Sequence, residues 1–141
     1  MDFSITFDVA APPDRVWAVM SDIERWPQWT PSVTSIRPLS KGPLGLGSRA
    51  LIRQPKLPPA VWKVVAHEPG RSFTWTSGAP GLRVTAHHFI EPTAQGTRVT
   101  LSLRFGSLLG PLFGRLTRGL NDRYLGLEAK GLKRRSEESA V

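Results

Sequence analysis

Residues 2–17, which read DFSITFDVAAPPDRVW, decide how the fold begins. The odd-numbered positions from Phe3 to Val9 are apolar and alternate with polar residues, a period of two that is typical of a strand with one buried face. Pro12-Pro13-Asp14 predicts the start of a helix, because proline suits the first helical turn and an acidic residue suits its positive end. The buried side of this helix is predicted to consist of Val16, Trp17 and Met20.

A second short helical turn is predicted after the first helix. Ser21-Asp22 resembles a helix cap, and Pro27 disfavours helical geometry at Trp26, so this turn should end near Trp26-Pro27. Period-two patterns then predict strands near residues 32–38, 48–54, 60–68, 71–77, 82–91 and 97–105. The links between them are short and rich in turn residues, as in Glu68-Pro69-Gly70-Arg71. Such short links require neighbouring strands to be antiparallel.

From Leu108 the apolar residues recur at three- and four-residue steps, which predicts an amphipathic helix of up to ~30 residues. This segment contains Gly114, Gly119, Gly126 and Gly131, and glycine disfavours a helix interior. The glycines indicate either a bend or a need for space, and those at 119 and 126 are expected to leave room beside the helix. The fold class expected is α+β, with a curved antiparallel sheet around a long C-terminal helix.

The composition fits one soluble domain, placed at residues 1–136, with a frayed C-terminus at 137–141. The 141-residue chain has no cysteine, and acidic residues interrupt its N-terminal segment, so a cytoplasmic location is expected. The net charge of +8 raises non-specific affinity for nucleic acids and anionic membranes. No readout motif accompanies this charge, so no specific nucleic-acid partner is expected.

The motifs of cofactor and metal sites are weak. Gly45-Leu46-Gly47-Ser48-Arg49-Ala50 has the letters of a dinucleotide fingerprint but runs into prolines instead of a helix, so no cofactor is expected. His87 and His88 are neighbours on a predicted strand and point to opposite faces, so they cannot bind one metal ion together. No metal site is expected. His88 shares its face with Val84 and Ala86, and is either a hydrogen-bonded core residue or a group that contacts ligand or transfers protons.

Strand parity also points several aromatic residues to the concave side of the sheet. Trp62 shares a face with Val64 and Ala66, and Trp75 shares one with Phe73. They are either large core residues or the wall of an apolar small-molecule pocket, with Trp29 closing its mouth. The candidate ligand-binding residues are Trp29, Ile52, Trp62, Phe73, Trp75, Val84, Ala86, His88, Leu101, Leu103, Leu120 and Tyr124.

The segments Ala11 to Trp17, Ser21-Asp22 and Trp26 to Pro31 resemble the opening of the START-like, or SRPBCC, superfamily of polyketide cyclase/dehydrase-like proteins. The later order of Glu68-Pro69-Gly70, Glu91-Pro92 and Leu132-Lys133 agrees with it. The resemblance implies the helix-grip fold: seven antiparallel strands, two small helices after the first strand, and a long last helix that closes a cavity. Members look like carriers of lipids, quinones, hormones or polyketides, and some are cyclases or hydratases.

Three functions remain open from the sequence. The first is binding of a small hydrophobic molecule, such as a lipid, isoprenoid, quinone or aromatic polyketide, by a carrier or sensor. The second is a cyclase/dehydratase-type enzyme in which His88 acts as acid or base. The third is a basic interaction module for nucleic acid or the ribosome. We expect a monomer or weak homodimer with at most transient membrane contact, since the long helix needs its apolar stripe to close the sheet.

Overall fold

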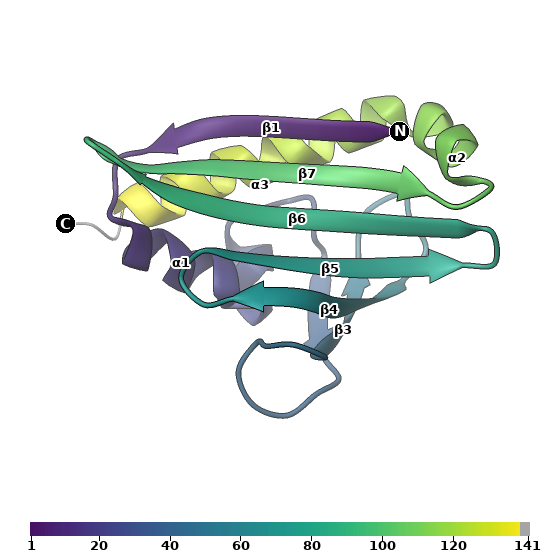
Figure 1. Cartoon of the computed structure of the whole chain (residues 1–141), viewed down its shortest axis with the longest axis horizontal. Coiled ribbons are helices and arrows are strands. Elements are labelled where there is room, and N and C mark those ends of the chain that lie inside the picture. The colour runs from purple at the N-terminus through teal and green to yellow at the C-terminus, as the bar shows by residue number, and fades with distance from the viewer. Residues whose placement is uncertain (139–141) are drawn as a thin grey trace.

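The computed structural model describes residues 1–138 and contains one antiparallel sheet that curves around a C-terminal helix (Figure 1). The sheet has seven strands in the order β1-β7-β6-β5-β4-β3-β2, so the first two strands form its edges. The strands are β1 (Asp2–Val9), β2 (Ser35–Pro38), β3 (Arg49–Arg53), β4 (Ala60–Glu68), β5 (Ser72–Ala79), β6 (Leu82–Thr93) and β7 (Gly96–Gly106). The predicted helix-grip architecture is confirmed.

The concave face of the sheet carries the core, as the strand patterns predict. In β1, Phe3 and Val9 are buried while Asp2 and Asp8 are exposed. The turn at Glu68-Pro69-Gly70-Arg71 also forms: Arg71 N donates to Glu68 O at 3.0 Å, and Gly70 has a φ of 77°, which favours glycine. These local signals place the strands that form the site.

A β-bulge in β4 changes one predicted face. The pairing of β4 with β5 shifts between Val64 and Ala66, and beyond it His67, not Ala66, lies opposite the buried Phe73. Ala66 is exposed, so its predicted place on the face of Trp62 and Val64 is wrong. An extra residue in one strand reverses which positions point inward, and the bulge therefore brings His67 to the inner face.

Two short helices follow β1. Helix α1 (Pro13–Ser21) begins at its proline as predicted, and Val16 and Met20 are buried, whereas Trp17 is half-buried. The 3-10 helix η1 (Ile23–Gln28) starts after Asp22 but has no side-chain cap, which corrects the expected Ser21-Asp22 cap. Instead, Asp22 pairs with Arg25 at 2.6 Å and Ser21 Oγ donates to Trp17 O at 2.7 Å.

The predicted single C-terminal helix is divided into α2 (Gly110–Leu116) and α3 (Arg118–Glu138) at Thr117. Helix α2 lies on β7, because Gly110 and Gly114 meet the Phe105 backbone and ring, where no Cβ would fit freely. Helix α3 extends to Glu138, beyond the expected end at 136, and Glu137 accepts hydrogen bonds from Ala10 N and Lys133 Nζ. Residues 139–141 of the expected frayed end lie outside the described residues.

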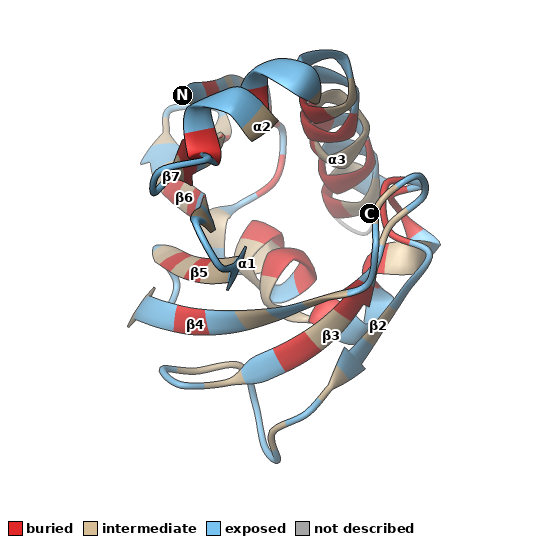
Figure 2. Ribbon diagram, turned by 90° about the vertical axis from the view of Figure 1, so that its right-hand side faces the viewer, coloured by how far each residue is buried: buried red, intermediate tan, exposed pale blue. Residues whose placement is uncertain are grey.

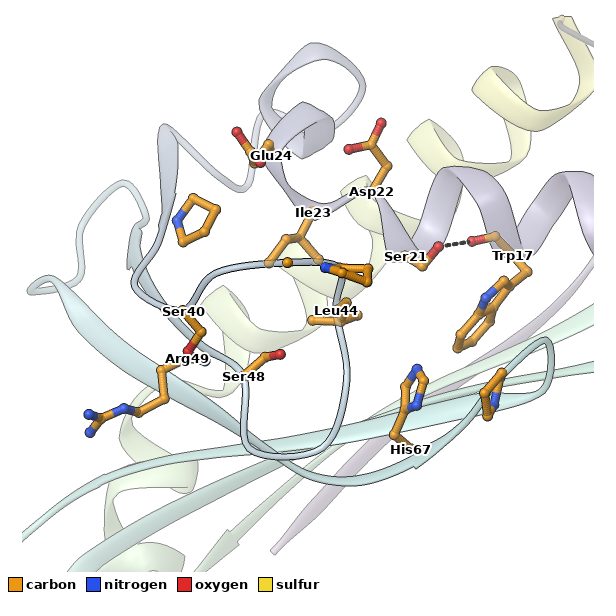
Figure 3. Close-up of a pocket in the computed structure, with 14 residues that line it drawn as sticks. Trp17, Ser21, Asp22, Ile23, Glu24, Ser40, Leu44, Ser48, Arg49 and His67 are labelled. Atoms are coloured by element: carbon orange, nitrogen blue, oxygen red, sulfur yellow. Dashed lines mark hydrogen bonds between the residues drawn. The ribbon is translucent and has the colours of Figure 1, made fainter.

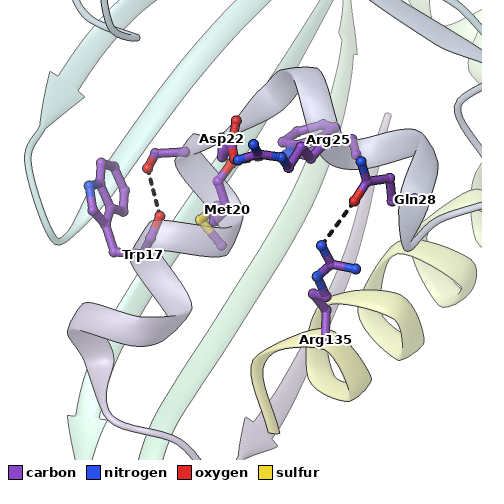
Figure 4. A network of polar contacts seen from close by, with 8 residues as sticks. Trp17, Met20, Asp22, Arg25, Gln28 and Arg135 are labelled. Atoms are coloured by element: carbon purple, nitrogen blue, oxygen red, sulfur yellow. Dashed lines mark hydrogen bonds and ion pairs between the residues drawn. The ribbon is translucent and has the colours of Figure 1, made fainter. Parts of the chain in front are cut away.

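Helix α3 is also tied to η1. Arg135 Nη2 donates to Gln28 Oε1 at 2.9 Å, so the C-terminal part of α3 is held against the segment that follows α1 (Figure 4). Close beside this contact, Gly131 touches the Trp29 backbone. Within residues 1–138 no helix is long and apolar enough to cross a bilayer.

Candidate functional site

A cavity of about 430 Å³ lies between the concave face of the sheet and the C-terminal helices. Figure 2 shows the backbone of α3 on the opposite side of the molecule from β3 and β4. Strands β3 to β7 supply one wall, and α2 and α3 supply Phe113, Asn121, Tyr124, Leu125 and Glu128 on the other. Leu57, in the link between β3 and β4, and Leu82, at the start of β6, complete the lining. Its volume lies within the roughly 300–1,000 Å³ of small-molecule sites.

Aromatic side chains form the inner wall of this cavity. The ring of Trp75 lies 5.8 Å from that of Trp62 and 5.4 Å from that of Trp26, measured between centroids. Trp26 is fixed in place because its Nε1 donates to Met20 O at 3.0 Å. Behind them Phe73 stacks on His88 with the centroids 4.1 Å apart. The wall is therefore a rigid apolar surface suited to flat or branched hydrocarbon groups.

One ionisable pair interrupts the apolar lining. His88, on β6, is buried, and its Nε2 lies 3.7 Å from Oε1 of Glu128 on α3. Its Nδ1 lies 3.3 Å from the Phe73 carbonyl oxygen, which can only accept, so Nδ1 carries hydrogen there. At 3.7 Å the two side chains face each other without a direct hydrogen bond. They therefore bring an imidazole and a carboxyl group together at one point of an otherwise apolar lining.

The neighbouring histidine lies on the other side of the sheet. His87 is exposed, and its Nδ1 lies 2.9 Å from Thr74 Oγ1, whereas His88 is buried, which confirms their predicted opposite faces. Partial burial and the charge of His88 lower the pKa of His87 below its usual value. Among residues 1–138 no three His, Asp or Glu side chains converge in a group that could hold a metal ion.

Two further polar groups stand at the helical wall. Asn121 Nδ2 donates to Thr117 Oγ1 at 2.9 Å, and Thr117 Oγ1 donates to Phe113 O at 2.8 Å, so the break between α2 and α3 is held by side chains. The Tyr124 hydroxyl donates to Pro55 O and fastens the 54–60 link to α3. Burial raises the pKa of Tyr124 above its usual value.

Most of the candidate residues lie at this cavity. Those that line it are Ile52, Trp62, Trp75, Val84, Ala86, His88, Leu103 and Tyr124. Trp29, Phe73, Leu101 and Leu120 do not line it. Trp29 is buried against Gly131 instead of closing the mouth, and Phe73 and Leu101 are buried in the core below the wall. Leu120 is half-buried on α3. Ligand binding by any of these residues stays a prediction.

Sequence reasoning missed two important lining residues. Trp26 lies in the 3-10 helix η1, where no strand parity reveals the direction of its side chain. Glu128 lies on α3, and no motif in the sequence pairs it with His88. Its spacing of four from Tyr124 was an available signal, since residues four apart share one helical face. The prediction that Gly119 and Gly126 leave room for the cavity is wrong, because neither residue lines it.

A second cavity of about 440 Å³ is bordered by α1, η1 and the loop between β2 and β3 (Figure 3). Its lining includes Trp17, Ile23 and Leu44 together with Asp22, Glu24 and Arg49. The β4 bulge brings His67 to it, with ring centroids 5.9 Å from Trp17. The charges of both signs around it indicate no single ligand chemistry.

Comparison with known proteins agrees with this architecture. The family described as "Polyketide cyclase / dehydrase and lipid transport" matches residues 1–137. No curated protein sequence matches the chain.

Three solved structures illustrate the shared fold. A Thermus thermophilus protein is 21% identical with a TM-score of 0.75, and the match covers 100% of both chains. A START superfamily protein from Mycobacterium smegmatis is 18% identical with a TM-score of 0.73, covering 94% of this chain and 97% of that one. A point mutant of norcoclaurine synthase from Thalictrum flavum, bound to a transition-state analogue, is 15% identical with a TM-score of 0.77, covering 100% and 96%. At these identities the likeness establishes the fold alone.

Proposed function

This chain belongs to the polyketide cyclase/dehydrase and lipid transport family, and on that premise we propose that it binds a small hydrophobic molecule as a carrier or sensor. The observation that supports this function is the cavity of about 430 Å³ beneath the sheet, lined chiefly by aromatic and aliphatic side chains. Trp26, Trp62 and Trp75 would contact the ligand body. Apolar pockets with a few fixed polar groups are the usual sites for such molecules.

The polar groups define the ligand further. His88 and Glu128 form one polar point in an apolar cavity, and Asn121 and Gln54 add amides to the lining. A ligand that fits is therefore hydrophobic over most of its surface and carries a carbonyl or hydroxyl group near His88, because a buried polar pair gains from a hydrogen-bonding partner. A lipid, an isoprenoid, a quinone and an aromatic polyketide all meet this description.

Native mass spectrometry of protein purified from its own host tests this function directly. We expect a fraction of the protein to be heavier by the mass of one bound ligand. Solvent extraction should release an apolar compound of that mass. A matched preparation of Trp75→Asp should lose the adduct, because a charge replaces an aromatic wall residue. Protein that carries no adduct and also binds no hydrophobic compound from a lipid extract of its host would contradict the proposal.

A second function is favoured by one specific observation, the 3.7 Å approach of His88 Nε2 to Glu128 Oε1. A cyclase or dehydratase needs a base that removes a proton beside a carbonyl and an acid that returns a proton to the departing hydroxyl, which leaves as water. This pair has both capacities in one cavity. The His88→Ala variant separates the functions: a carrier keeps most of its ligand affinity, whereas an enzyme keeps affinity and loses turnover of a polyketide substrate.

A further inference from the structure

Four exposed leucines surround helix α2, and we call Leu108, Leu109, Leu112 and Leu116 the leucine face. Their exposed fractions are 90%, 48%, 55% and 75%. Leu112 and Leu116 are four residues apart within α2, so they share one side of the helix, and Leu108 and Leu109 lie in the turn that leads into it. Scattered single leucines on a surface are ordinary, but a contiguous apolar patch marks an interaction site.

The opposite side of α2 is committed to the fold. Gly114 is buried on the Phe105 ring, and Phe113 packs at 5.8 Å from that ring and lines the cavity. Leu109 lies against Gly81 in the β5–β6 turn, and its N donates to Gly81 O at 2.7 Å. Helix α2 is therefore packed firmly against the sheet, and the leucine face remains exposed. It lies at the end of the sheet where Phe113, Gly78 and Leu82 border the cavity.

The charges around the leucine face have one sign. No acidic residue occurs between Glu91 and Asp122, whereas Arg115 and Arg118 are exposed beside the leucines. Arg83, which is also exposed, pairs with Gly106 just before the segment. Among the described residues none of these three arginines takes part in an ion pair. Their positive charge is thus available to an external anion.

We propose that the leucine face docks on the surface of a lipid bilayer that contains anionic headgroups. Exposed leucines flanked by unpaired arginines are the combination that an interfacial segment requires, since apolar side chains enter the acyl boundary while basic groups meet the headgroups. A second copy of this chain fits less well, because a symmetric contact through this face would bring the arginines of both copies together. Docking here would place the cavity border against the bilayer, and it does not depend on the ligand's identity.

Vesicle sedimentation tests the proposal. The protein should bind vesicles of phosphatidylcholine with phosphatidylglycerol more tightly than vesicles of phosphatidylcholine alone. Raising the salt from 0.1 M to 0.5 M shortens the Debye length from about 10 Å to about 4 Å and should weaken the anionic component of binding. Replacing Leu112 and Leu116 by serine should weaken binding about ten-fold for each leucine. Arg118→Gln should weaken binding to anionic vesicles roughly five-fold.

Matched controls exist in the 39–48 loop. Leu46 is 74% exposed and Lys41 is exposed, so Leu46→Ser and Lys41→Gln remove the same kinds of groups elsewhere and should leave vesicle binding unchanged. All these positions are exposed, and equal thermal unfolding curves would verify the fold. Absence of binding to anionic vesicles, or equal losses in test and control variants, overturns the proposal. A dimer in sedimentation velocity that Leu112→Ser/Leu116→Ser dissociates, without vesicle binding, would overturn it in favour of a second copy.

Discussion

His88 Nε2 on β6 lies 3.7 Å from Glu128 Oε1 on α3, so a single ionisable pair joins the sheet to the C-terminal helix across the cavity. Both side chains are largely withdrawn from solvent, with exposed fractions of 5% and 18%. The relationship links the stability of the fold to the chemistry of the site, because the two residues come from elements that are otherwise separated there by cavity space.

The two residues should be energetically coupled. In a double-mutant cycle with His88→Ala and Glu128→Ala, we expect an interaction energy of about 0.5 to 2 kcal/mol in the free energy of unfolding, as found for residues in contact. The control cycle pairs Glu128→Ala with His87→Ala on the opposite face of the sheet. Urea denaturation measures both cycles, and a coupling no larger than the control would show that the pair does not interact.

Trp75 should contribute to binding of an apolar fluorescent probe. The probe should quench tryptophan emission, and Trp75→Ala should weaken its binding by about 1 kcal/mol or more, comparable to a lost aromatic contact. Trp17→Ala is the control, because Trp17 borders the second cavity and not this one. Fluorescence titration gives both affinities. Equal losses in the two variants would mean that the probe does not occupy the cavity beneath the sheet.

Two glycines of α3 should respond in opposite ways to alanine. A Cβ on Gly131 would clash with the carbonyl oxygen of Trp29, so we expect Gly131→Ala to lower the free energy of unfolding by about 2 kcal/mol or more. A Cβ on Gly126 meets nothing within 4 Å, so Gly126→Ala should raise stability by up to about 1 kcal/mol through helix propensity. Chemical denaturation measures both. A neutral Gly131→Ala would show that Trp29 is not held against the helix.

Tyr124 is the only tyrosine of the chain, so its ionisation can be followed directly by the change in ultraviolet absorbance when the phenol becomes phenolate. Burial raises the pKa of Tyr124 above about 10, so the folded protein should titrate at higher pH than the chain in guanidinium. The neutral form is favoured by folding. Stability should therefore be complete below the unfolded pKa and fall as pH rises through the folded pKa. Coincident titrations in both states would contradict this.

The strand positions could be predicted because their signals are local. The alternation from Phe3 to Val9 and the Glu68-Pro69-Gly70-Arg71 turn each carry their own geometry, and both form as predicted. The facing of Ala66 could not be predicted, because the bulge after Val64 arises from pairing with β5 and leaves no mark in the β4 sequence itself. The alternation of apolar and polar residues predicts the face of each side chain only while the pairing register of the strand is continuous.

The site was predictable where strands form it and not where other elements do. His88, Trp62 and Trp75 were correctly placed at the cavity side by parity. The choice between Trp26 and Trp29 depended on the path of η1 and on the close approach of Gly131, which are tertiary facts. Glu128 required knowing the rotation of α3 against the sheet, and the break at Thr117 makes that rotation independent of α2.

The position of β1 at the edge of the sheet has a consequence for folding kinetics. Phe3 pairs with Leu103 on β7, so the first strand finds its hydrogen-bonding partner only after the other strands of the sheet have been synthesised. Contacts so distant in sequence raise the contact order, which slows folding. During synthesis the apolar side chains of β1 therefore stay uncovered until β7 has formed, and exposed apolar surface of this kind is prone to aggregation.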